Sequence, residues 1–392
     1  MLDPNKSLIS PMQRKHLVIY IVILLLLSLS ESGQSETRNE ETIRILIGKY
    51  KKDFFASGTN IRLSSMSEGK ITSFNFKQNI LTIQKKDQGL KVNKSYVRGQ
   101  QFLLSSTDGE LAINGTPYGG TVIISSNDDQ EVLLINEIAL ERYLEGLISI
   151  ELSPRWDITT MKVQAVVART YSLYQKSLNT NRSYHITSSV LHQLYRGIAH
   201  ANSNTRRAVK ETRGEILTWN DLPIMAVYHS CCGGSTESSA NVWGSYKPYL
   251  EGVFCGMCSN YDNYFWKLVI PRGTFFKQLC KDGFVDCNDF ESIVNLKRSP
   301  ANRVIQISFR GEYRTSIIPG NELRSVFGFS KIRSTSFIIK ETEDGYLNLL
   351  GTGNGHGVGL CQWGARARAQ RGETYYQILQ HYYPGTQIKR AY

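Results

Sequence analysis

Cysteine is absent from the first 230 residues of this 392-residue chain, and all seven cysteines follow that point. The absence excludes a lipid attached through a cysteine near the N-terminus. The sequence also lacks a zinc-finger, RRM-like or helix-turn-helix pattern, which argues against a nucleic-acid partner. The formal net charge of +12 still indicates an anionic partner, and charge alone does not choose between anionic lipid and an acidic cell-wall polymer.

A long apolar run occurs near the N-terminus, at Leu17–Leu27, and it is shorter than the roughly 20 residues that a membrane-spanning helix needs. Basic residues Lys6, Arg14 and Lys15 precede it, and small and polar residues follow. This pattern is typical of a secretory signal. We therefore predict that residues 1–32 are a signal peptide, or a membrane anchor if uncleaved, and that the protein is exported to the periplasm or cell envelope.

Export makes disulfides the favoured state of the cysteines. The candidates for pairing are Cys231, Cys232, Cys255, Cys258, Cys280 and Cys287. The spacing Cys255-x-x-Cys258, with His229 and Cys232 upstream, is also compatible with a zinc site. We favour disulfides and expect no metal ion and no other cofactor. Because seven is odd, at least one thiol stays unpaired within the chain.

Residues 33–130 are predicted to form a β-rich module. Short β-prone runs (IRILIG, ITSFNF, ILTIQ, QFLLSS and GTVIIS) alternate with turn pairs such as Asp108-Gly109 and Asn114-Gly115. The pattern indicates a small barrel or sandwich. A last strand, Glu131–Asn136, leads directly into the next helix, so we expect the module to be docked on the region that follows.

The stretch Leu140–Glu151 is predicted to be a helix that carries a carboxylate on its apolar side. The apolar stripe consists of Leu140, Tyr143, Leu144, Leu147 and Ile148, and its next position is Glu151. Glu141 and Glu145 fall off the stripe and are expected to meet water. Pro154 disfavours further helix, so Glu151 ends it. A partly desolvated glutamate has a raised pKa and can act as a general acid; the alternative is a helix-end residue that points to solvent.

A second helix is predicted at Thr159–Lys176, and its nearly uniform apolar character indicates burial. Lys162 and Arg169 share one face of it, and Gln164 points elsewhere. Long cations on a buried helix need partners. They either form internal ion pairs or line the site of an anionic substrate.

The C-terminal region contains the glycine-dense stretch GTGNGHGVGLCQWGA, followed by two predicted helices. Its glycines imitate a phosphate-binding fingerprint but lack the surrounding βαβ unit. We expect them to let the backbone and His356 approach a ligand or a neighbouring strand.

Five ordered segments resemble the SpoIID/LytB family of bacterial peptidoglycan-acting proteins. They are NEIALERYLEGLISIELSP, MKVQAVVARTYSL, QLYRG, VYHSCCGGSTESSANVWG with PYLEGV, and GHGVGLCQWGARARAQRGETYYQILQHYYPGT. Together they cover most of residues 131–392. The resemblance implies an α+β fold in which a β-rich N-terminal module is docked on a mixed α/β catalytic region, residues 131–392, with a substrate cleft.

The resemblance further implies a lytic transglycosylase that cleaves the bond between N-acetylmuramic acid and N-acetylglucosamine in glycan strands stripped of peptides. The essential glutamate of the family carries over to Glu151. The expected substrate-binding residues are Lys162, Gln164, Arg169, Tyr195, His229, His356 and Gln362. A further expected partner is an N-acetylmuramoyl-L-alanine amidase. The alternative, from the LytB branch, is a non-catalytic amidase enhancer or a wall-binding protein.

The sequence departs from the family at one site. Some SpoIID proteins bind zinc through a histidine and two cysteines ahead of the QLYRG segment. Here His185 remains, but Thr187 and His192 stand near the cysteine positions. A zinc site of that kind is therefore not expected.

Overall fold

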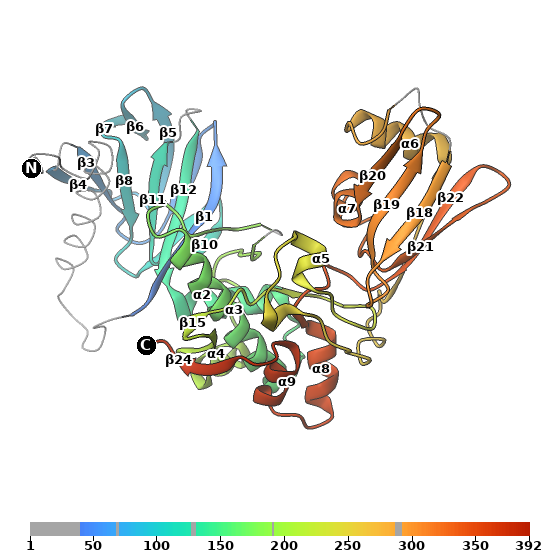
Figure 1. Ribbon diagram of the computed structural model, residues 1–392. Helices are drawn as coiled ribbons and strands as arrows, with labels where there is room; N and C mark the ends of the chain where they lie inside the picture. Colours follow the sequence, from blue (N-terminus) through green and yellow to red (C-terminus); the bar gives the residue numbers. More distant parts are fainter. Residues whose placement is uncertain (1–39, 68–69, 127–130, 190–191, 287–291) are drawn as a thin grey trace, which may run out of the picture. The chain divides into compact units, whose positions relative to one another are not determined.

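The computed structural model describes residues 40–392 except 68–69, 127–130, 190–191 and 287–291 (Figure 1). The predicted signal segment, residues 1–32, lies outside the described residues. Among the described helices, none combines the length and the apolar character needed to cross a membrane. The strands and helices together confirm the α+β class.

The described chain forms two compact units. The first unit holds the chain up to Pro154, residues 172–206 and Tyr392, and the second holds residues 155–171 and 207–391. The β-rich module and the helix predicted to carry Glu151 therefore belong to one unit. We predicted that the catalytic region begins at residue 131. This boundary stays a prediction.

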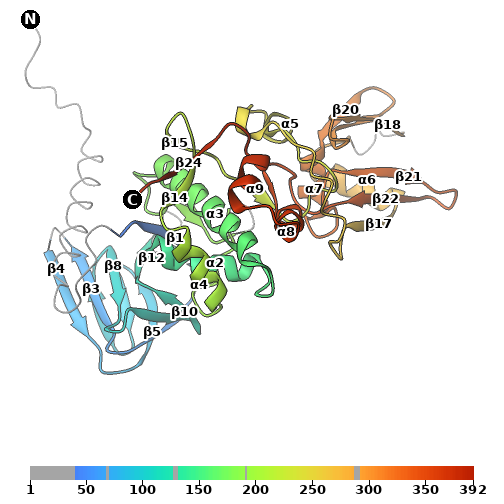
Figure 2. The ribbon, with the colours of Figure 1, turned by 90° about the horizontal axis from the view of Figure 1, so that it is seen from below.

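The first unit contains two sheets. The seven-stranded sheet has the order β13-β1-β12-β11-β8-β3-β4 and the six-stranded sheet the order β10-β9-β2-β5-β6-β7. Figure 2 shows β4, β3 and β8 side by side at one edge of the larger sheet. The strands are β1 (Thr42–Tyr50), β2 (Phe54–Ser57), β3 (Arg62–Ser67), β4 (Lys70–Asn75), β5 (Ile80–Lys86), β6 (Gly89–Val92), β7 (Ser95–Arg98), β8 (Gln101–Ser105), β9 (Glu110–Ile113), β10 (Thr116–Gly119), β11 (Thr121–Ser126), β12 (Val132–Ala139) and β13 (Ile186–Thr187).

The pairing of these strands follows from local sequence. All the predicted β-prone runs form strands, and Asn114-Gly115 joins β9 to β10 with positive φ at both residues, as a two-residue hairpin turn requires. β1 pairs antiparallel with β12 over nearly its whole length. Strand β12 ends at Ala139 and helix α2 (Leu140–Glu151) begins at the next residue, so the sheet directly fixes the start of α2.

The second unit is mixed. Its helices are most of α3 (Ile158–Leu178), most of α4 (Ser203–Glu211), α5 (Ser239–Trp243), the 3-10 helix η1 (Pro248–Leu250), α6 (Arg272–Lys281), α7 (Gly320–Phe327), α8 (Gln362–Gln370) and α9 (Tyr375–Tyr382). Its strands are β14 (Glu215–Trp219), β15 (Leu222–Pro223), β16 (Tyr228–His229), β17 (Phe265–Pro271), β18 (Ser292–Arg298), β19 (Val304–Arg310), β20 (Thr315–Pro319), β21 (Phe337–Glu341), β22 (Tyr346–Thr352), β23 (Leu360–Cys361) and β24 (Gln387–Arg390).

Two cores stabilise the second unit. One gathers α3, β14, the cysteine-bearing loops, α8 and α9, and includes Val166, Leu217 and Leu379. The other lies among β17–β22, α6 and α7. Residues 163–172 of α3 are all buried, which confirms the prediction for this helix. No local pattern predicted β24, which pairs antiparallel with β14 from the far end of the chain.

Candidate functional site

Glu151 is the last residue of α2, and its side chain is half-buried. The five apolar stripe residues that precede it are all fully buried. Leu152 leaves the helix in an extended conformation, and Ser153 and Pro154 are exposed. The prediction that the helix ends at Glu151 after a buried apolar stripe is therefore confirmed. The raised pKa expected for Glu151 stays a prediction.

The other two acids of α2 are not both exposed as predicted. Glu141 is only 5% exposed, and the Tyr392 hydroxyl donates to its carboxylate. The periodicity of α2 cannot reveal that the C-terminal residue covers this side of the helix. Glu145 is partly exposed and pairs with Arg206 at 3.7 Å between Oε2 and Nε. Burial raises the pKa of Glu145, while Arg206 acts in the opposite direction.

Tyr195 is a core residue of the first unit, with 2% exposure. Its ring packs on Tyr143 of α2, with centroids 4.8 Å apart, and its hydroxyl lies 3.3 Å from Oδ1 of Asn136. Asn136, which we had not singled out, is also buried and donates to the carbonyls of Gly119 and Thr121 at 2.8 and 2.9 Å. Tyr195 thus packs against the buried side of α2. A residue in this position is not available to bind substrate.

Three residues of the QLYRG segment, Gln193, Tyr195 and Gly197, contact α2. The hydroxyl of Tyr143 donates to Oε1 of Gln193 at 2.9 Å. A Cβ atom added to Gly146 would lie 2.4 Å from the carbonyl oxygen of Gly197, so the two backbones are in direct contact. The segment therefore fixes the position of the helix that carries Glu151.

Arg169 is fully buried in the second unit. Its guanidinium donates to the carbonyl oxygens of Glu215 at 3.0 Å and of Val209 at 3.4 Å. These contacts join α3 to β14 and to α4. A guanidinium used in this way inside the core does not serve an anionic substrate, so the prediction of a substrate-binding role is not retained.

Lys162 forms an internal ion pair, which is one of the two alternatives expected for the cations of this helix. Its Nζ lies 2.5 Å from Oε2 of Glu211 and 5.6 Å from the ring centroid of Tyr375. Hydrogen bonds from Lys162 and Arg207 lower the pKa of Glu211 to about 2. Lys162 therefore holds α3 to α4, and this ion pair would have to break before it bound a substrate.

His229 and His356 lie together in the second unit, with ring centroids 5.4 Å apart. The peptide groups of Val358 contact both rings: its carbonyl oxygen lies 3.1 Å from Nδ1 of His229, and its N–H donates to Nδ1 of His356 at 3.1 Å. Nε2 of His356 lies 2.8 Å from the carbonyl oxygen of Tyr228. These contacts assign the proton of His229 to Nδ1 and that of His356 to Nε2.

The glycines around His356 explain how it approaches its neighbour. Gly355 has φ +113°, and a Cβ atom there would lie 2.6 Å from Cβ of His229. Only glycine allows this backbone so close to the strand that carries His229. The expectation that the glycines permit close approach is confirmed. Trp243, 43% exposed, lies 5.2 Å from His356 between ring centroids; its place within the VYHSCCGGSTESSANVWG motif was the only sequence signal for it.

Among the described residues of this unit, several buried polar atoms have no hydrogen-bond partner. Two of them belong to predicted binding residues, Nε2 of His229 and Nε2 of Gln164. The first is an acceptor, given the proton on Nδ1, and the second is a donor. Gln362 donates to Oε1 of Gln164 at a long 3.4 Å. Unsatisfied buried groups are rare and costly, so these two atoms of predicted binding residues are candidates to bind polar groups of a ligand.

The cysteines differ from the predicted disulfides. Cys231, Cys232, Cys255 and Cys258 are free and buried, as is Cys361. Cys280 is disulfide-bonded, and Cys287 lies outside the described residues. The long connections that bring the free thiols together were not visible in their spacing.

The residues at the family's zinc position have other contacts. The main-chain N–H of Arg44 donates to Nδ1 of His185 at 3.1 Å, and Nη2 of Arg44 lies 2.9 Å from Nε2 of the same ring. Nδ1 of His192 accepts from the N–H of Thr187 at 3.2 Å. The expectation that this position lacks a family-type zinc site stays a prediction.

Two histidine rings are expected to remain neutral well below pH 6.5. Burial, followed by the charge of Arg44, lowers the pKa of His185 to about 3. Burial, followed by Arg324, lowers the pKa of His356 to about 3. Between about pH 6.5 and 3 the unfolded chain binds protons that the folded chain does not. The free energy of unfolding should therefore decrease as the pH is lowered from about 6.5 to 3.

Ring-labelled histidine NMR measures this directly. We expect the His185 and His356 resonances to keep their neutral positions from pH 7.5 to 5, assigned through single His-to-Gln variants. Titration of both rings near pH 6.5 would contradict the hydrogen-bond assignments.

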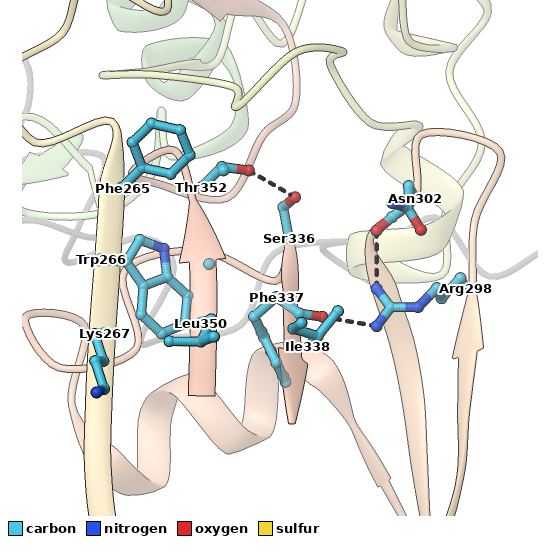
Figure 3. Close-up of a pocket in the computed structure, with 11 residues that line it drawn as sticks. Phe265, Trp266, Lys267, Arg298, Asn302, Ser336, Phe337, Ile338, Leu350 and Thr352 are labelled. Atoms are coloured by element: carbon cyan, nitrogen blue, oxygen red, sulfur yellow. Dashed lines mark hydrogen bonds between the residues drawn. The ribbon is translucent and has the colours of Figure 1, made fainter. Parts of the chain in front are cut away.

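A separate pocket of about 570 Å³ lies on the sheet β17-β22-β21 (Figure 3). Trp266 and Phe337 form part of its apolar floor, with ring centroids 5.9 Å apart. Arg298 closes one side by donating to the carbonyl oxygen of Phe337 at 2.7 Å. No carboxylate is among the described residues that line it, so this pocket does not supply an acid for glycoside cleavage.

Comparison with protein families gives two matches. A family model described as SpoIID, stage II sporulation protein, matches residues 128–219. A second, described as a domain of unknown function, matches residues 259–359, the part of the second unit that contains the pocket.

Comparison with curated proteins gives several relatives. The chain is 30% identical to an uncharacterized protein of Brachyspira hyodysenteriae over 322 residues, which cover 82% of this chain and 85% of that protein. It is 26% identical to stage II sporulation protein D of Bacillus amyloliquefaciens, over 78% of this chain and 89% of the relative. It is 30% identical to the amidase enhancer of Bacillus subtilis, over 72% of this chain but only 45% of that protein.

Proposed function

The chain belongs to the SpoIID family, and from this premise we propose that it acts on the bacterial cell wall as a lytic transglycosylase. The proposed substrate is the glycan strand, cut at the β-1,4 bond that links N-acetylmuramic acid to N-acetylglucosamine. The proposed product is a strand that ends in 1,6-anhydro-N-acetylmuramic acid. We further propose that the protein is exported, since its substrate lies outside the cytoplasm.

The observation that carries this proposal is the position of Glu151. It ends α2 after a fully buried apolar stripe, and its own side chain is half-buried beside exposed chain. Residues of the QLYRG segment hold α2 in place. A general acid needs both features, a partly desolvated carboxyl and a rigid support.

The reaction uses Glu151 twice. The protonated carboxyl first donates its proton to the glycosidic oxygen, and the bond between that oxygen and C1 of the muramic residue breaks. The resulting carboxylate then removes the proton from the C6 hydroxyl of the same residue as its oxygen attacks C1. The new C1–O6 bond closes the anhydro ring and Glu151 regains its proton. Water is not consumed, so the second carboxylate of a hydrolase is not required.

Four of the predicted binding residues remain candidates for contacts with glycan. They are Gln164, His229, His356 and Gln362. Nε2 of His229 and Nε2 of Gln164 are among the buried atoms without a partner in the described residues, and sugar hydroxyl and acetamido groups offer the complementary donor and acceptor. Trp243 adds an exposed aromatic ring beside His356.

A second candidate function is that of an amidase enhancer. It is favoured by the identity to the Bacillus subtilis protein of that name. In this case the partner is an amidase, and the net charge of +12 would help to hold the protein on an acidic wall. Glu151 would then have no chemical role.

One experiment separates the two functions. The purified protein is incubated with peptide-free glycan strands, and the products are examined by mass spectrometry for anhydro ends. In parallel, an amidase is assayed on intact wall with and without the protein. The transglycosylase predicts anhydro ends without any amidase. If the protein stimulates the amidase and forms no anhydro ends on either substrate, the lytic transglycosylase proposal is wrong and the amidase-enhancer function takes its place.

A further inference from the structure

Four cysteine thiols of the second unit converge on one point. The sulfur atoms of Cys232, Cys255, Cys258 and Cys361 all lie within 4.8 Å of one another, and all four residues are buried. They come from three separate segments: the loop after β16, the segment between η1 and β17, and the end of β23. Such a gathering of reactive thiols requires a chemical reason.

The sulfur positions do not fit disulfides. Sγ of Cys232 and Sγ of Cys258 are 3.5 Å apart, whereas a disulfide bond is about 2.05 Å long. Their separations, none above 4.8 Å, are compatible with four ligands around one metal ion. A zinc–sulfur distance of about 2.3 Å places sulfur ligands about 3.8 Å from one another. The arrangement leaves room for a single ion, and an iron–sulfur cluster would need its ligands farther apart.

Hydrogen-bond donors surround these sulfurs, as they do around metal-bound thiolates. The main-chain N–H groups of Cys232 and Gly364 each donate to Sγ of Cys361 at 3.3 Å. The hydroxyl of Tyr382 lies 3.2 Å from Sγ of Cys255. Four thiolates and one Zn²⁺ carry a net negative charge, and the buried guanidinium of Arg303 donates to the carbonyl oxygen of Cys232. These contacts offer hydrogen-bond donors to anionic sulfur.

Cys231 is the fifth free cysteine and does not belong to this group. Its Sγ donates to the carbonyl oxygen of Cys258 at 3.6 Å, which is the behaviour of a protonated thiol. It is equally buried and directly precedes Cys232. Cys231 is thus a matched control for any experiment on the cluster.

We propose that Cys232, Cys255, Cys258 and Cys361 bind one zinc ion in a closed, structural site. All four coordination positions would be filled by protein, so the ion would have no open position for water or substrate. Zinc fits because it prefers tetrahedral coordination and binds soft thiolate ligands well. Binding releases the four thiol protons.

The ion would hold together the segments that carry the predicted glycan-binding residues. His229 lies three residues before Cys232 and opposite Cys361 in the β16–β23 pair. Gln362 directly follows Cys361. The zinc site is independent of the proposed reaction, and it would exist equally in an amidase enhancer.

The first test is the metal content of the full-length protein, purified without chelator and measured by plasma mass spectrometry. We expect one zinc per chain in the wild type and in Cys231→Ser, and a loss of the zinc in Cys258→Ser. Because Cys258→Ser could fail to fold, the wild type is also stripped and titrated with Co²⁺. Tetrahedral thiolate coordination then gives intense visible absorption bands.

The proposal is overturned by either of two results. The first is metal-free wild-type protein in which mass spectrometry locates disulfides among the four cysteines. The second is fully reduced protein that binds neither Zn²⁺ nor Co²⁺. Equal loss of zinc in Cys231→Ser and Cys258→Ser would also contradict the assignment of the four ligands.

Discussion

Replacement of Glu151 by glutamine is expected to reduce the rate of glycan-strand cleavage by about 10²–10⁴-fold. Glutamine keeps the size and the hydrogen-bonding capacity of the side chain but can neither donate the proton to the leaving oxygen nor remove the proton from the C6 hydroxyl. Because Glu151 is half-buried at the end of α2, the melting temperature should stay close to that of the wild type. The measurement is the initial rate of anhydro-end formation.

Glu145→Gln is the matched control for this variant. Glu145 lies on the same helix, is also partly buried, and has a raised pKa caused mainly by burial. Its partner is Arg206, and the proposed mechanism gives it no role, so this variant should cleave at nearly the wild-type rate. Equal losses in both variants would show that the acid has been misassigned or that α2 is disturbed as a whole.

Replacement of Gly146 by alanine is expected to lower the free energy of unfolding by about 1–3 kcal/mol. Helix propensity predicts the opposite, since alanine favours a helix interior by up to about 1 kcal/mol over glycine. The steric contact with Gly197 outweighs helix propensity and makes the substitution destabilising. The added Cβ atom would lie 2.4 Å from the carbonyl oxygen of Gly197, and a backbone atom cannot move away as a flexible side chain can. Chemical denaturation measures the change.

Gly273→Ala provides the comparison. Gly273 is also helical, within α6, and a Cβ atom there meets nothing within 4 Å. This variant should be neutral or slightly stabilised, because only the propensity changes. If Gly146→Ala were as stable as Gly273→Ala, the close contact between α2 and the QLYRG segment would be wrong. The Gly146 variant should also lose cleavage activity, since a shift of α2 moves Glu151.

The elements fixed by neighbouring residues could be predicted from the sequence. The stripe of α2 identified its buried face, and the turn Asn114-Gly115 identified a hairpin, because both depend on periods of a few residues. Glu141 shows the limit. Its burial depends on Tyr392, 251 positions away, and no local pattern contains that contact.

The same limit applies to the predicted site. Arg169 was a reasonable candidate for an anion site until β14 and α4 supplied carbonyl oxygens for its guanidinium. Cys255 and Cys258 were visible as a motif, but Cys361, the fourth member of the cysteine cluster, follows more than a hundred residues later. Export favoured disulfides for these cysteines, and the free thiols correct that prediction.

The most direct measurement of the central claim is cleavage of peptide-free glycan strands in water enriched in oxygen-18. The proposed mechanism closes the ring with the O6 atom of the sugar and consumes no water. It predicts muramic ends that are lighter by one water than hydrolysis products and that carry no oxygen-18. Ends that are full-weight reducing sugars with one oxygen-18 atom would contradict it, and the enzyme would then be a hydrolase.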